Sequence, residues 1–170
     1  IISKFFKKIT NEFSKNQKLI IGQSERFKKL TKIRLVPFKS RTKILIILSG
    51  IKKIDEELMS MAIETCELNK KIKIYIKPHP ILNIEEIISK KNIPINIIVY
   101  KGDLKKILMN SLITITAGPS SALLESVSFC SFNILPTIEC GTINNAKIFN
   151  LRKNEYSLVN NSKELELQIN

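Results

Sequence analysis

The sequence predicts an α/β fold: a Rossmann-like parallel β-sheet with helices on both faces. Three observations predict it. Short, continuous apolar runs, of the kind that form strands buried on both faces, begin near residue 43. Helical patterns alternate with these runs at the spacing of βαβ units. With 170 residues, 44% of them hydrophobic, the chain is long enough to bury one core. Right-handed crossovers then make the strands parallel and place helices on both faces.

The first predicted elements are a strand, a helix and a second strand. Residues 44–48 are all apolar, which predicts a buried strand. Asp55 is expected to cap the next helix, with Glu56 and Glu57 in its first turn. Isoleucine alternates with Lys73 and Tyr75 over residues 72–76, which predicts the second strand.

The alternation of helices and strands continues to about residue 135. Asn83, with Glu86 three residues later, predicts a capping box for a helix that runs through about Lys90. The later elements are a strand over 95–100, a helix capped by Asp103, a strand over 112–116, a helix around 123–127 and a strand over 132–135. Beyond Gly141 the chain is polar and weakly patterned, apart from a helical pattern over 162–169.

The N-terminal part differs from the rest in charge. Residues 1–53 hold 15 Lys and Arg against two acids, whereas the charges of residues 54–170 cancel. A short amphipathic helix is predicted around residues 6–13 and a strand-like run at 19–22. We therefore divide the chain into a basic N-terminal helix and linker over 1–42, interpreted as the end of a preceding domain, and a Rossmann-like domain over 43–170.

The composition indicates which classes of binding partner and which cellular compartment to expect. The basic segment is either a solvated tail or a peripheral contact with an anionic membrane surface. Nucleic acid is not expected, because no stacking module or helix-turn-helix pattern accompanies the charge. The three cysteines lack paired spacing, so neither disulfides nor a zinc site is expected. No apolar run is long enough to span a bilayer, and no leader is visible. Together these features predict a cytoplasmic protein.

Three of the loops that follow predicted strands carry unusual residues. Ser49-Gly50 follows the first strand, Lys77-Pro78-His79-Pro80 the second, and Ala117-Gly118-Pro119-Ser120-Ser121 the fourth. Ligands of open parallel sheets bind beyond the carboxyl ends of the strands. We therefore expect these loops to form one ligand site.

The loop after the fourth strand has the properties of an anion site. Gly118 lets the backbone approach a ligand, and Pro119 suits a first helical position. The amides and hydroxyls of Ser120 and Ser121 would then face a phosphate at the positive end of a helix. Glu125, one turn later, is placed to accept hydrogen bonds from a ribose or sugar hydroxyl. The alternatives are that a serine only caps this helix and that Glu125 only complements its dipole.

His79 is the one histidine of the chain, and it lies between two prolines that leave few local amides to pair with. Its imidazole can donate to a phosphate oxygen, and Lys77 can add a positive charge. The alternative is a purely structural histidine. The absence of an Asp-x-Asp arrangement or a carboxylate cluster at a strand end predicts that no metal takes part, and no other cofactor is expected.

A strand ending in Lys77-Pro78-His79-Pro80, with the turn and helix of residues 116–125 about 40 residues later, resembles the C-terminal domain of GT-B glycosyltransferases of bacterial surface polysaccharides. Capsule and O-antigen enzymes of the sialyltransferase-like and Kdo-transferase-like groups are the nearest likeness. The resemblance covers about residues 43–141. It implies a CMP- or UDP-sugar donor and a glycan or lipid-linked acceptor. His79, Pro80, Ser120 and Ser121 would then lie at the donor phosphates and Glu125 at the ribose or sugar.

In enzymes of this type the catalytic base and the acceptor site usually come from an N-terminal domain, so no base is assigned here. His79 is instead expected to stabilise the leaving phosphate as the sugar bond breaks. A sugar-nucleotide 2-epimerase and a non-catalytic binding module or inactive fragment remain as alternatives. An α/β-hydrolase is not expected, because its histidine would follow the serine, and here the histidine precedes Ser120. Phosphate-loop and dinucleotide fingerprints are absent.

Overall fold

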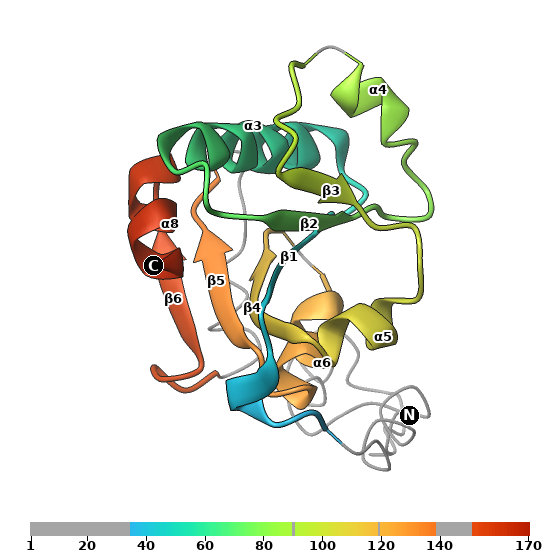
Figure 1. Ribbon diagram of the computed structural model, residues 1–170. Coiled ribbons are helices and arrows are strands. Elements are labelled where there is room, and N and C mark those ends of the chain that lie inside the picture. Colours follow the sequence, from blue (N-terminus) through green and yellow to red (C-terminus); the bar gives the residue numbers. More distant parts are fainter. Residues whose placement is uncertain (1–34, 90, 119, 139–150) are drawn as a thin grey trace, which may run out of the picture. The chain divides into compact units, whose positions relative to one another are not determined.

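The computed structural model of the chain describes residues 35–89, 91–118, 120–138 and 151–170 (Figure 1). These residues belong to one compact unit, which runs from Val36 to Asn170, apart from Leu35. The helix predicted around 6–13 and the strand-like run at 19–22 lie outside the described residues. The division at residue 43 therefore stays a prediction.

A parallel sheet forms the centre of the unit, and its strands lie in the order β3-β2-β1-β4-β5-β6. Every neighbouring pair is parallel. The described strands are β1 (Lys43–Ile47), β2 (Ile74–Lys77), β3 (Ile97–Val99), β4 (Ser111–Thr116), β5 (Phe132–Pro136) and β6 (Tyr156–Val159). The chain winds outward in both directions from β1 and β4, so the order reverses between these two strands. This is the Rossmann-like arrangement that the sequence predicts.

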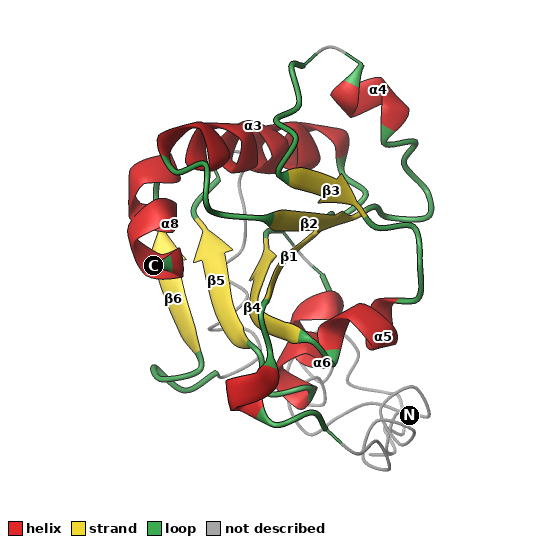
Figure 2. Ribbon diagram, in the orientation of Figure 1, coloured by secondary structure: helices red, strands yellow, loops and turns green. Residues whose placement is uncertain are grey.

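Helices cover both faces of the sheet, as Figure 2 shows. The helices α3 (Lys52–Leu68), α4 (Glu85–Ile88) and α8 (Ser162–Ile169) share one hydrophobic core with the strands. The helices α5 (Leu104–Leu108) and α6 (Ala122–Ser128) contact β1, β4 and β5. Right-handed crossovers explain this division, because the chain moves outward one way from β1 and the opposite way from β4.

The core lies on both sides of the two central strands. Leu45 and Ile46 are neighbours in β1 that point to opposite faces, and both are fully buried. On the side of α3, Ile46 packs in one cluster with Ile115 of β4, Met59 of α3 and Leu165 of α8. The apolar run of β1 is therefore continuous because neither of its faces meets water.

Helix starts agree with the sequence in one case and differ in another. Asp103 caps α5, since its side chain accepts a hydrogen bond from the Lys106 amide at 3.0 Å. The prediction that Asp55 caps the next helix is wrong, because α3 begins at Lys52 after Ile51. Asp55 lies inside the first turn, and its carboxylate bonds to the preceding loop instead.

Two further differences concern short elements. Asn83 does accept a hydrogen bond from the Glu85 amide at 3.2 Å, but α4 is a single turn that ends at Ile88. The strand β6 lies in the region that the sequence pattern leaves without an element, and it pairs with β5 at the edge of the sheet.

Candidate functional site

The three loops singled out in the sequence leave the sheet side by side. Ile47, the last residue of β1, pairs with Lys77 at the end of β2 and with Thr116 at the end of β4. The loops that follow these strands therefore begin at the same level of the carboxyl edge. This is the point where the strand order reverses, which is the usual ligand position in open α/β sheets.

Gly50 and His79 are in direct contact across this edge. Gly50 has a φ of +84°, and a Cβ atom built on it would lie 2.5 Å from Nδ1 of His79. Glycine is therefore required here for two reasons. It adopts the left-handed backbone conformation readily, and it has no Cβ to clash with the imidazole. The structure brings together two residues that the sequence offered separately.

Asp55 closes the loop that contains Gly50. One carboxylate oxygen accepts hydrogen bonds from the Ser49 amide at 2.7 Å and the Ser49 hydroxyl at 2.8 Å, and the other accepts from the Gly50 amide at 2.9 Å. The Asp55 side chain is completely buried. The backbone amides of Ser49 and Gly50 are thus bonded within the protein, and direct contact of these residues with a ligand stays a prediction.

The His79 ring is held by a local amide. The Ile81 amide donates to His79 Nδ1 at 3.3 Å, so one local amide pairs with the ring although prolines flank the histidine. In a neutral imidazole one nitrogen accepts and the other donates. With Nδ1 accepting, the proton of the neutral ring is on Nε2, which is then the hydrogen-bond donor for a ligand.

A shallow, open cavity of about 540 Å³ lies along the loop that follows β2. Its lining runs from Lys77 through His79 and Pro80 to Glu85, and it also includes Lys101. Lys101 lies 3.9 Å from Glu85, with both side chains largely exposed. Lys101 is not among the residues predicted from the sequence. It directly follows the third predicted strand, and a lysine at a strand end is the signal that points to it.

The loop after β4 packs against the loop after β1. Gly118 has a φ of +69°, and a Cβ on it would lie 2.8 Å from Ile54 Cδ1 and 3.8 Å from Ser49 Cβ. The helix α6 begins at Ala122, later than the predicted start at Pro119, which itself lies outside the described residues. The Ser120 hydroxyl accepts a hydrogen bond from the Ala122 amide at 3.2 Å and so closes the turn before the helix.

The other two residues predicted in this loop and helix differ in exposure. Ser121 is exposed, whereas Glu125 is buried, with an exposed fraction of 3%. A carboxylate in the first turn of α6 has the position that the sequence predicts. Its contact with a ribose or sugar stays a prediction, because the side chain faces the protein interior in this structure.

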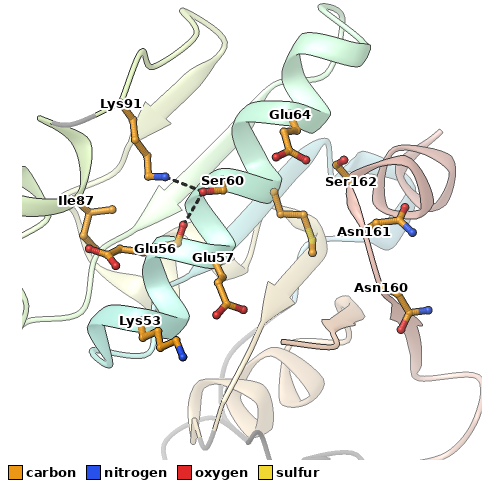
Figure 3. A pocket seen from close by; sticks show the side chains of 11 residues that line it. Lys53, Glu56, Glu57, Ser60, Glu64, Ile87, Lys91, Asn160, Asn161 and Ser162 are labelled. Atoms are coloured by element: carbon orange, nitrogen blue, oxygen red, sulfur yellow. Dashed lines mark hydrogen bonds between the residues drawn. The ribbon is translucent and has the colours of Figure 1, made fainter. Parts of the chain in front are cut away.

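A second cavity, of about 600 Å³, lies on the outer side of α3 and is drawn in Figure 3. Glu56, Glu57 and Glu64 line it, against the two lysines Lys53 and Lys91. The Lys91 ammonium donates to the Ser60 hydroxyl at 2.7 Å, which in turn donates to a backbone carbonyl of the same helix (Figure 3). The excess of carboxylates makes this cavity a poor site for an anion, although it is the larger of the two.

The described residues show neither a cluster of metal ligands nor a helix suited to cross a membrane. Within residues 35–89, 91–118, 120–138 and 151–170, no three His, Cys, Asp or Glu side chains gather as metal ligands do. The expectation that no metal or other cofactor takes part stays a prediction. In the same residues, no helix has both the length and the apolar character that crossing a membrane requires.

Comparison with known proteins gives a likeness to a solved structure. No protein-family model and no curated protein matches the sequence. The chain is similar to the crystal structure of the glycosyltransferase SnogD from Streptomyces nogalater, with a TM-score of 0.51 and 13% identity. The match covers 85% of this chain and 35% of SnogD, so the chain spans about a third of that protein. At this identity the likeness shows a glycosyltransferase-like fold.

Proposed function

We propose that this chain is the donor-binding domain of a glycosyltransferase and that the carboxyl edge of its sheet holds the phosphates of a CMP- or UDP-activated sugar. The observation that carries the proposal is the meeting of the β1, β2 and β4 loops where the strand order reverses, with Gly50 making room for His79. The fold likeness to a glycosyltransferase supports the same reading.

In this proposal, His79 and its neighbours stabilise the negative charge of the leaving nucleotide. The Nε2–H group of His79 donates a hydrogen bond to a phosphate oxygen. Lys77 and Lys101, which line the same cavity, add positive charge. The hydroxyls of Ser120 and Ser121 approach the phosphates from the β4 side. Pre-arranged donors at the position where charge develops are worth about 10²–10³ in kcat each in well-studied enzymes.

The remaining functions of the enzyme are assigned to parts outside the described residues. The chain spans about a third of SnogD, and we propose that a second domain supplies the catalytic base and the site for a glycan or lipid-linked acceptor. The biological setting that we propose is bacterial surface-polysaccharide synthesis at the cytoplasmic side of the membrane. The excess charge of residues 1–53 would hold the enzyme peripherally to anionic lipid.

Calorimetric titration of the chain with CMP, UDP and their sugar conjugates tests the proposal. We expect one nucleotide class to bind, and His79→Ala and the double variant Ser120→Ala/Ser121→Ala each to weaken its binding about tenfold or more, or about 1.4 kcal/mol. Glu64→Gln, in the cavity of Figure 3, is the control and should bind like the wild type. A folded chain that binds none of these nucleotides would show that the site is wrongly assigned.

A further inference from the structure

We infer that Asp55 is a positioning residue of this site: its buried carboxylate fixes the loop between β1 and α3 and thereby holds Gly50 against the His79 ring. The effect on donor binding rests on the proposed function. The effect on the ring itself does not, because both contacts are present without a ligand.

The Asp55 carboxylate is matched to the loop that it binds. It accepts three hydrogen bonds at 2.7, 2.8 and 2.9 Å, all from the two residues Ser49 and Gly50. All three partners are donors, and the carboxylate accepts on both of its oxygens, from Ser49 on one and from Gly50 on the other. Because Asp55 is in the first turn of a long, well-packed helix, the loop takes its position from α3.

The position of this loop determines where the imidazole lies. A Cβ added to Gly50 would lie only 2.5 Å from Nδ1, so the glycine backbone packs directly against the His79 ring. Nδ1 also accepts from the Ile81 amide, at a relatively long 3.3 Å. If Gly50 moves, the ring loses this support, and among the described residues the long hydrogen bond from the Ile81 amide is what still orients the ring and its Nε2–H group.

The Asp55 carboxylate bonds to backbone amides at a position where many related folds bind phosphate. In dinucleotide-binding α/β proteins, the loop after the first strand presents its amides to a diphosphate. Here the amides of Ser49 and Gly50 face a carboxylate of the protein itself. A donor phosphate is therefore directed away from these amides, toward His79 and the loop after β4.

Asp55→Asn is the most direct variant. Asparagine keeps the size of the side chain and one acceptor oxygen, but its NH₂ group would face the Gly50 amide, and two donors cannot bond to each other. The chain contains one histidine, so its imidazole ¹⁵N resonances report on His79 alone. We expect shifted or broadened imidazole resonances in ligand-free Asp55→Asn and nucleotide binding weakened about tenfold or more. Glu57→Gln removes the same charge from the same helix and should leave both unchanged.

Two further variants keep the test decisive if Asp55→Asn fails to fold. Ser49→Ala removes one of the three hydrogen bonds and should shift the same resonances by a smaller amount. Gly50→Ala places a methyl group against the ring and should displace it.

The outcomes separate this inference from the proposed function. Imidazole resonances and nucleotide affinity that Asp55→Asn leaves unchanged would overturn the positioning role and leave the donor site intact. Tighter nucleotide binding by Asp55→Asn would also overturn it, because the freed amides would then be the phosphate site. If the wild type binds no nucleotide, the proposed function fails, while the spectra of the ligand-free variants still decide the role of Asp55.

Discussion

At the scale of single residues, the polar side chains of β4 differ in whether they find a partner. The buried Ser111 hydroxyl donates to the Ile107 carbonyl at 2.8 Å. The hydroxyls of Thr114 and Thr116 are buried, and no hydrogen-bond partner for them is found in the part of the chain that the structure describes. A buried hydroxyl without a partner costs about 1–3 kcal/mol of stability.

Replacing such a hydroxyl with a methyl group should therefore stabilise the domain. We expect Thr114→Val to raise the free energy of unfolding by about 1 kcal/mol, because valine has nearly the same shape and no group to desolvate. Ser111→Ala, which removes a satisfied hydroxyl, should lower it by about 1 kcal/mol. Urea denaturation measures both. A destabilised Thr114→Val would mean that the hydroxyl has a partner in solution.

Cys66 gives the stability of the domain a dependence on pH. Burial raises the pKa of the Cys66 thiol to about 11, and the thiol lies 3.9 Å from the Ile72 carbonyl. The folded state keeps this proton over a pH range in which the unfolded chain has lost it. The stabilisation is therefore complete below the ordinary thiol pKa and is lost as the pH rises toward 11.

We expect the free energy of unfolding of the wild type to fall more steeply between about pH 9 and 11 than that of Cys66→Ala. Denaturant titrations at a series of pH values compare the two slopes. Equal slopes would show that the thiol ionises as readily in the folded state as in the unfolded chain. Cys130, which is exposed, supplies the matched control as Cys130→Ala.

The residues of the site show what single-sequence reasoning can find. His79 and Gly118 are recognisable because a histidine between prolines and a glycine before a serine pair are unusual after a strand. The contact of Gly50 with His79 depends on the register of β1 and β2, which no local pattern contains. The sequence predicts Asp55 as a helix cap for a related reason, because an acid near the start of a helix can either cap the helix or bind the loop before it.

At the scale of elements, the end of α6 contains a residue in an unfavourable conformation. Cys130 has a φ of 56°, in the left-handed region, and directly follows Phe129, the C-cap of the helix. Its amide donates to Val127 O, and the Ser131 amide donates to Ser126 O, as at many helix ends where glycine is preferred. The cysteine side chain is exposed, so it gains little from packing.

Cys130→Gly should therefore stabilise the domain. Relief of the left-handed strain, about 1–2 kcal/mol, exceeds the added backbone entropy of glycine, about 0.5–1 kcal/mol. Ser128→Gly, inside α6, should have the opposite sign because it adds the entropy cost without relieving strain. Thermal unfolding of the two variants should thus shift in opposite directions, and a lower melting temperature for Cys130→Gly would contradict the assigned backbone.

Strands and helices were predictable to the extent that their patterns are local. The buried run of β1 and the cap of α5 are read directly from sequence. The strand β6 has four residues at the edge of the sheet, with Leu158 half exposed, so its pattern is too short and too polar to stand out. The start of α6 was placed too early because the turn that Ser120 closes on Ala122 is a matter of side-chain geometry.

At the scale of the whole molecule, the parallel sheet determines where a ligand can bind. All described strands point the same way, so every loop that follows one of them lies on one edge of the sheet, and the place of the candidate site can be predicted without the strand order. The order itself results from packing between distant segments. The second cavity on α3 had no sequence signal, because its lining comes from three separate regions of the chain.

The central claim is that a nucleotide binds at the carboxyl edge of the sheet, and mapping of backbone amide NMR shifts during titration with CMP and UDP tests it most directly. We expect the largest changes at the amides of His79, Ile81, Gly118, Ser120 and Ser121, together with the imidazole of His79. Changes confined to the cavity of Figure 3, around residues 56–64 and 160–162, would contradict it, as would a titration without changes anywhere.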